Sequence, residues 1–169
     1  MTIIAEYTEE EQELLRSALE SAAVAVSAAS LGRKEETVSE GYAAADLVLK
    51  SQAQYVGNTL VTSIIVQLQA DLKSGHVFPN YLDVASTPGA LDESKIVLGR
   101  VAQLVDTKST PEEAAGYKGW LLQIAQAVAG AGKEDQGFLG RGGVLVNDAE
   151  RSALASIAQT LGVEAPAGS

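Results

Sequence analysis

Four segments of the sequence open with the same helix-start pattern, a Thr or Asn followed three residues later by Glu. Such a pair forms a capping box, in which the first side chain accepts the backbone N–H of the Glu and the Glu side chain accepts the backbone N–H of the first residue. The pairs are Thr8 with Glu11, Thr37 with Glu40, Thr110 with Glu113, and Asn147 with Glu150. Pro111 strengthens the third start, because its fixed φ and missing N–H suit the first helical position. A chain with four such starts is predicted to be helical.

Apolar residues follow these starts three or four residues apart, which is the spacing of one helix face. The pattern predicts helices over residues 8–30, 37–73, 92–107, 110–132 and 147–161. The apolar stripe of the second helix consists of Ala45, Leu49, Val56, Leu60, Ile64, Leu68 and Leu72. The stripes of the last three helices are Ile96, Val97, Val101, Leu104 and Val105; Tyr117, Trp120, Leu121, Ile124 and Val128; and Ala153, Leu154, Ile157, Ala158 and Leu161. The 27 alanines favour helices that pack closely through small side chains. We therefore predict an all-α, single-domain bundle of five or six helices over residues 1–169, with an ordered core over about 8–162 and a frayed tail over 163–169.

Several details of this bundle follow from the same patterns. The alanine-rich helix over 8–30 should lie centrally, and the element over 37–73 should be the longest, with a kink or short break at Gly57-Asn58. The stretch 76–91 contains Pro79 and Pro88 and is predicted to be a long connection. Tyr117 and Trp120 fall on the core face of their helix, and Gly162 is predicted to end the last helix.

Charge and composition exclude several classes of partner. The chain has 22 acidic and 12 basic residues and a net charge of −10, which disfavours contact with nucleic-acid phosphates and anionic membranes. The most apolar window, residues 56–68, is interrupted by Asn58, Thr59, Thr62 and Gln67, so no membrane insertion is expected. The first residues carry no signal-like pattern, and a cytoplasmic location is the default expectation. With no Cys, the chain has no thiolate nucleophile or disulfide.

A cluster of five glycines marks the stretch before the last helix: Gly132, Gly137, Gly140, Gly142 and Gly143. It does not match a Walker loop, because Ala127 replaces the first glycine and Glu134 stands in place of the final Ser or Thr. It also lacks the dinucleotide-binding spacing, and an EF-hand loop ending at Glu150 would place Leu139 at the first ligand position. We predict a loop that joins two antiparallel helices. Phe138 and Leu139 either pack on the bundle or, if exposed, bind a protein partner or a second copy of the chain.

The alternative to a simple connecting loop is an ion site formed by four carboxylates around it. Glu134, Asp135, Asp148 and Glu150 are hard oxygen ligands of the type that binds Ca²⁺ or Mg²⁺. The simpler interpretation, which we favour, assigns Glu150 to its capping box and leaves the others solvated near a helix N-terminus. No other cofactor is predicted.

The single histidine, His76, limits the catalytic possibilities. One histidine cannot build a zinc site or a di-iron centre, and no triplet of nucleophile, base and orienting group is visible at any spacing, so the sequence predicts a protein that is not an enzyme. An alternative function is a carrier or accessory protein that binds a small apolar molecule between helices. Its pocket would open under residues 76–84, with His76, Tyr81 and Asp83 as the polar lining.

The segment VNDAERSALASIAQTLGV, which follows a helix, an Ala-Gly turn and acidic residues, resembles the helical bundle of the tellurite-resistance TerB-like family. The resemblance covers about the last 40 residues. The family's turn reads Ala-Asp-Gly, whereas Ala131-Gly132 lacks the Asp and residues 137–144 form an insertion, so only Asn147 and Glu150 match the family's cap and following Glu. The resemblance implies a non-catalytic all-α protein that acts through protein or ion binding in a stress response.

Overall fold

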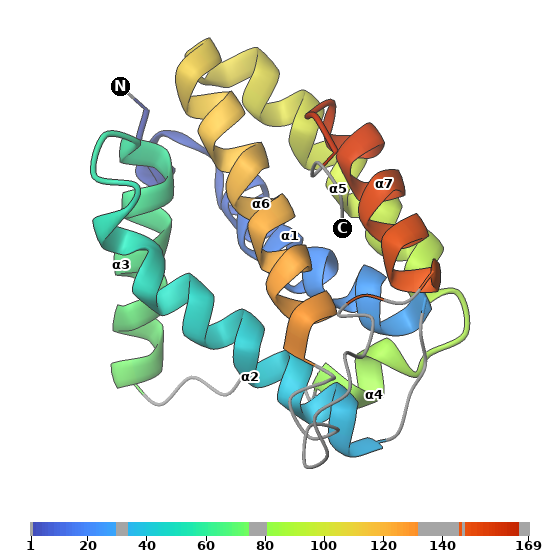
Figure 1. The fold of residues 1–169 in the computed structure, drawn as a ribbon. Helices are drawn as coiled ribbons and strands as arrows, with labels where there is room; N and C mark the ends of the chain where they lie inside the picture. The colour runs from blue at the N-terminus through green and yellow to red at the C-terminus, as the bar shows by residue number, and fades with distance from the viewer. Residues whose placement is uncertain (1, 30–33, 75–80, 132–145, 147, 166–169) are drawn as a thin grey trace.

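The computed structural model describes residues 2–29, 34–74, 81–131, 146 and 148–165, and for residues 34–40 and 81–82 it describes the backbone alone. The described residues form seven α-helices and no strand, so the all-α prediction is confirmed and the predicted number of five or six helices is too low (Figure 1). The helices are α1 (Glu9–Ala29), α2 (Lys34–Lys50), α3 (Thr59–Lys73), α4 (Tyr81–Ala85), α5 (Ala90–Lys108), α6 (Pro111–Ala131) and α7 (Asp148–Leu161), with 3-10 turns at η1 (Ile4–Glu6) and η2 (Ser51–Ala53).

Helix α1 lies in the middle of the bundle, as its alanines predict. It packs against α5, α6 and α7, and also contacts α2 and α4. Ala18, Ala22 and Ala25 are fully buried along its length. Because an alanine side chain ends at Cβ, neighbouring helices approach α1 closely on several sides, and Figure 1 shows α6 crossing in front of it with α5 and α7 beside it.

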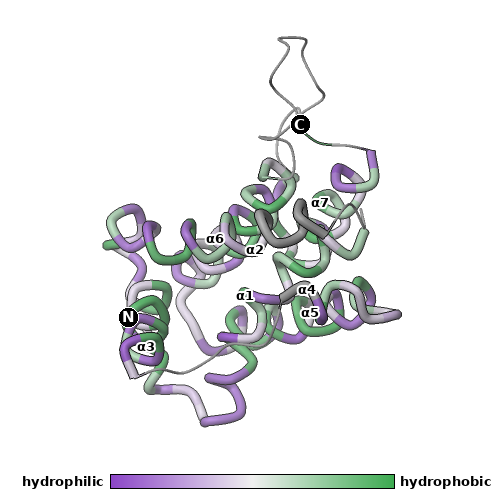
Figure 2. The backbone as a smooth tube through the Cα atoms, turned by 90° about the horizontal axis from the view of Figure 1, so that it is seen from below, coloured by the Kyte–Doolittle hydropathy of each residue, from purple (hydrophilic) through white to green (hydrophobic). Residues whose placement is uncertain are grey.

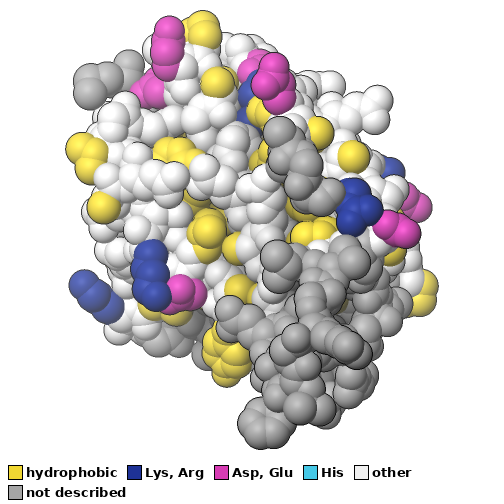
Figure 3. Space-filling view, viewed as in Figure 1, with side chains coloured by type: hydrophobic (Ala, Val, Ile, Leu, Met, Phe, Trp, Pro, Cys, Tyr) yellow, Lys and Arg dark blue, Asp and Glu magenta, His cyan; other side chains and the backbone are white. Residues whose placement is uncertain are grey.

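Helix α6 is the second buried helix. Its predicted core face is confirmed: Tyr117, Trp120, Leu121, Ile124 and Val128 are all fully buried. The Tyr117 hydroxyl donates to the Leu15 carbonyl at 2.7 Å, which joins α6 to α1. From Gly119 to Ala131 the helix carries no charged residue. On the face drawn in Figure 3, charged side chains accordingly lie toward the edges.

The predicted element over 37–73 is two helices, and this accounts for part of the error in helix number. Helix α2 begins at Lys34, so Thr37 lies inside the helix and does not start it. The chain leaves helix at Ser51 and re-enters it at Thr59 after Asn58, whose side chain accepts the Val61 N–H at 3.0 Å as an N-cap. The prediction that this element is the longest is therefore wrong. Helices α1 and α6, of 21 residues each, are the longest described.

The connection between α3 and α5 also contains a helix that the sequence patterns did not predict. Helix α4 (Tyr81–Ala85) buries Ala85 against Val24 of α1 and Ala90 of α5. Helix α5 begins at Ala90, two residues before the predicted start, after Gly89 with a φ of 85°. In the sequence, Pro79 precedes this short helix and Pro88 follows it.

Two of the four capping boxes are confirmed, and they position α1 and α6. The Thr8 N–H donates to Glu11 at 2.9 Å and the Glu11 N–H donates to Thr8 Oγ1 at 3.3 Å. The Glu113 N–H donates to Thr110 Oγ1 at 3.3 Å, with the return bond at 3.4 Å. Asn147 lies outside the described residues. The last helix ends as predicted, with Gly162 at a φ of 67°.

A close approach between α3 and α6 depends on Gly116. The Asn58 side chain that caps α3 also donates to the Glu113 carbonyl of α6 at 3.0 Å. A Cβ on Gly116 would collide with Asn58 Nδ2. Asn58 cannot move aside without losing both hydrogen bonds, so Gly116 is required for this joint between the two helices.

We expect Gly116→Ala to lower the free energy of unfolding by about 1–3 kcal/mol, the cost of a buried clash or a lost buried hydrogen bond. The matched control is Gly119→Ala, one turn along the same helix, where an added Cβ meets no atom within 4 Å. Alanine is the better helix former, so the control should be neutral or stabilising by up to about 1 kcal/mol. Equal urea midpoints for the two variants would contradict the role assigned to Gly116.

None of the described helices is both long enough and apolar enough to cross a membrane.

Candidate functional site

The residues predicted as an ion site are only partly described, and the described ones are separately engaged. Asp148 is exposed and pairs with Arg151 at 2.8 Å. Glu150 is buried on the inner side of α7. Glu134 and Asp135, as well as the predicted partner-binding residues Phe138 and Leu139, lie outside the described residues. Within the described part of the chain, no three His, Cys, Asp or Glu side chains come together in a way that could hold a metal ion.

The predicted ligand-binding residues belong to the region of α4. His76 lies outside the described residues. The backbone of Tyr81 forms the start of α4, and its side chain is not described. Asp83 is exposed on α4, and its carbonyl accepts a hydrogen bond from Thr87 Oγ1 at 3.0 Å. Asp83, the one residue of the three whose side chain is described, does not line the cleft that the helices form elsewhere.

That cleft opens between α1, α2 and α3, and its volume is about 850 Å³. Leu19 and Ala23 of α1, Val48 of α2, Leu68 of α3 and Ile124 of α6 form its apolar lining. Helix α3 stands apart from α1 in both views of the backbone (Figures 1 and 2). Ligand-binding pockets in proteins have volumes of about 300–1,000 Å³ and are mostly apolar, so the cleft is of a suitable size and character.

Small residues on α2 keep the cleft open. Gly41, Ala44 and Ala45 face it and contribute no side chain beyond Cβ. Leu49 at the end of α2 and Leu72 at the end of α3 also line it, and they remain 38% and 44% exposed. Large apolar side chains at this level of exposure on opposite sides of one cleft leave apolar surface that a ligand could cover.

The polar groups of the cleft come mainly from one face of α1. Glu13, Arg16 and Glu20 are three and four residues apart, so they lie along the same side of the helix. Arg16 pairs with Glu13 at 2.9 Å. On α3, Gln67 donates to Asp71 at 3.2 Å. Most charged and amide groups of the cleft are thus paired within their own helix.

Glu20 differs from these groups. Its side chain is half-buried, and it makes no hydrogen bond or ion pair with any residue that the structure describes. Burial raises the pKa of its carboxyl, because the low dielectric around it disfavours the charged form. A carboxylate placed in an apolar cleft without a partner is a candidate for ligand contact.

The most strongly perturbed carboxyl in the described structure, Glu113, is structural. Burial alone would raise its pKa, but hydrogen bonds from Thr59, Thr2 and Thr110 outweigh this and lower the pKa from 4.5 to about 2. The Thr2 N–H donates at 2.8 Å, Thr59 Oγ1 at 2.6 Å and Thr110 Oγ1 at 3.1 Å. A carboxylate that is 6% exposed and held by these donors joins three segments of the chain and is not available to a ligand.

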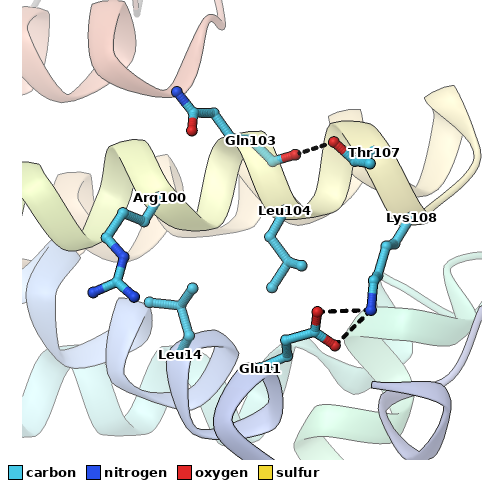
Figure 4. Close-up of a pocket in the computed structure, with 7 residues that line it drawn as sticks. All are labelled: Glu11, Leu14, Arg100, Gln103, Leu104, Thr107 and Lys108. Carbon is cyan, nitrogen blue, oxygen red and sulfur yellow. Dashed lines mark hydrogen bonds and ion pairs between the residues drawn. The ribbon is translucent and has the colours of Figure 1, made fainter. Parts of the chain in front are cut away.

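A second, shallower hollow lies between α1 and α5 (Figure 4). Its volume is about 410 Å³. Lys108 reaches across from α5 to both oxygens of Glu11 on α1, at 2.6 and 2.7 Å, beside the apolar side chains of Leu14 and Leu104. Its lysine and glutamate neutralise each other, so this hollow is a weaker candidate than the cleft.

Four of the residues that line the cleft belong to an apolar pattern that we interpreted as core-facing. Ala45, Leu49, Leu68 and Leu72 were all expected on one core-facing stripe of the element over 37–73. All four line the cleft. Leu68 is also buried in the core, as predicted, whereas Ala45, Leu49 and Leu72 remain exposed. The sequence feature that corresponds to the cleft is the set of small residues on α2 together with the large apolar residues at the ends of α2 and α3.

Comparison of the chain with protein-family models, with curated proteins and with solved structures gives no match.

Proposed function

We propose that this protein is a non-catalytic binding protein whose cleft between α1, α2 and α3 takes up a small apolar molecule. The observation that carries the proposal is the cleft itself: about 850 Å³ lined by Leu19, Val48 and Leu68, with large apolar side chains exposed at its edges. This is the carrier hypothesis, with its pocket at α1–α3 and not under residues 76–84. We also take the chain as one domain, because a single buried cluster draws on η1 and on every described helix except α4.

The lining chemistry favours binding over catalysis. Ser17 carries the one hydroxyl among the described lining residues, and its Oγ donates to the Leu14 carbonyl of its own helix at 3.1 Å. A nucleophile of this kind needs a neighbouring base to activate it, and the described part of the lining contains no histidine. The hypothesis of protein or ion binding, with its TerB-like stress-response role, rests on residues around 132–145 and stays a prediction.

A neutral solvatochromic dye such as Nile red tests the proposal. Its fluorescence should rise and shift to the blue when it enters the cleft. Ala45→Phe should weaken dye binding by about tenfold or more, equal to about 1.4 kcal/mol, because Ala45 is exposed and lines the cleft, so that the added ring occupies ligand space.

The matched control is Ala155→Phe on α7, an alanine that is also exposed and does not line the cleft. It should bind the dye as the unmodified protein does. Circular dichroism of both variants checks that the helices remain. Unchanged dye binding by Ala45→Phe, with the helices intact, would place the binding site elsewhere and overturn the proposal.

A further inference from the structure

The charges of the cleft are unequal in sign. Among the described lining residues, three are carboxylates, Glu13 and Glu20 of α1 and Asp71 of α3, and one is a guanidinium, Arg16. The described side chains that α2 and α6 contribute to the lining are uncharged. Because Arg16 is paired with Glu13, the described lining offers no further cation to compensate the remaining carboxylates.

Glu20 is the carboxylate placed to contact a ligand directly. It is half-buried in the cleft, one turn from Ala23 and beside Leu19 on α1, whereas Glu13 is held by Arg16 and Asp71 by Gln67. A ligand whose apolar part lies against Leu19 and Val48 would bring its polar end near this group. A buried charge without a partner is costly, and a cation beside it removes that cost.

We propose that the cleft selects an amphiphilic cation, that is, an apolar chain or ring that carries a protonated amine, and this proposal rests on the proposed function. Glu20 pairs with the amine. The apolar lining accounts for the body of such a ligand, and the excess of carboxylates accounts for its charge. Anionic amphiphiles such as fatty acids are disfavoured, because their carboxylate would face Glu20 and Asp71. Burial raises the pKa of Glu20, because its charged form is disfavoured in the cleft, and an ammonium group beside it would favour that form.

The test uses a pair of ligands that differ only in the head group, n-octylammonium and n-octanol, each displacing Nile red at concentrations below micelle formation. In the unmodified protein, octylammonium should displace the dye at a concentration about tenfold or more below the concentration of octanol that is needed. The reason is that the ammonium group gains a hydrogen bond to a charged group, Glu20. Glu20→Gln should abolish this difference while the dye and octanol bind as before.

The matched control is Glu10→Gln, which removes the same charge from an exposed position on the same helix, outside the cleft. It should keep the preference for the amine. Equal displacement by the two ligands in the unmodified protein, or a preference that survives Glu20→Gln, would overturn the assignment of Glu20 while leaving the apolar cleft in place. A dye that does not bind the unmodified protein at all would overturn both the assignment and the proposed function.

Discussion

Replacement of Glu113 by alanine is expected to lower the free energy of unfolding by about 3–5 kcal/mol. The carboxylate accepts hydrogen bonds from Thr2, Thr59 and Thr110, which belong to the N-terminal segment, the start of α3 and the start of α6. Each buried donor left without an acceptor costs about 1–3 kcal/mol, and part of this is recovered where water enters. The loss should therefore exceed that of an ordinary helix cap, which is about 1 kcal/mol.

Urea denaturation followed by the fluorescence of Trp120, the single tryptophan, measures this loss. The matched control is Glu112→Ala, which removes the neighbouring exposed carboxylate from the same first turn of α6 and should cost less than about 1 kcal/mol. If the two variants lost equal stability, Glu113 would act only through the helix dipole, and its hydrogen bonds would contribute nothing measurable.

The dependence of the unfolding free energy on acidic pH provides a second test of the role of Glu113. The pKa of Glu113 is about 2 in the folded protein against an ordinary value of 4.5, so the folded state binds its proton less readily than the unfolded state does. The resulting stability is fully present above about pH 4.5 and is lost as the pH falls toward 2. The unmodified protein should therefore lose more stability between pH 5 and pH 3 than Glu113→Ala does, while the other carboxylates contribute to both.

Local patterns predicted the parts of this fold that local chemistry determines. The starts of α1 and α6 follow from side chains three residues apart, and Gly162 ends α7 because it adopts a positive φ at little cost. The buried faces of α6 and α7 were also predicted, since both helices are enclosed along their apolar stripe.

Long-range features were not predictable in the same way. The capping box accounts for the bond between Thr110 and Glu113, but no local pattern brings Thr2 and Thr59 to the same carboxylate. On α5, Ile96 was expected in the core and is 63% exposed, whereas Leu98 is fully buried. Whether an apolar residue on a stripe is covered depends on a partner helix, and the stripe itself does not specify where that partner lies.

The cleft illustrates the same limit. Leu60, Ile64 and Leu72 occupy one predicted stripe, yet the first two are fully buried and Leu72 is 44% exposed. Helix α3 meets α6 along its first half, where Asn58 and Gly116 fix the contact, and its far end lines the cleft. The separation of α3 from α6 beyond their close contact is determined by tertiary packing. An apolar stripe does not specify it, so the sequence pattern predicted a continuous core.

Replacement of Leu154 by alanine is expected to cost about 2–5 kcal/mol of unfolding free energy. Leu154 is 2% exposed, and with Ile157 and Leu161 it attaches α7 to the rest of the core, where the helix packs against α1, α5 and α6. Truncation at such a site removes apolar burial and leaves a cavity that rigid neighbouring helices fill only in part. Lys73→Ala, at the exposed end of α3, is the control and should change stability by less than about 0.5 kcal/mol. If α7 is held by its apolar face, Leu154→Ala has the lower urea midpoint of the two variants. The reverse order would mean that α7 contributes little to the stability of the bundle.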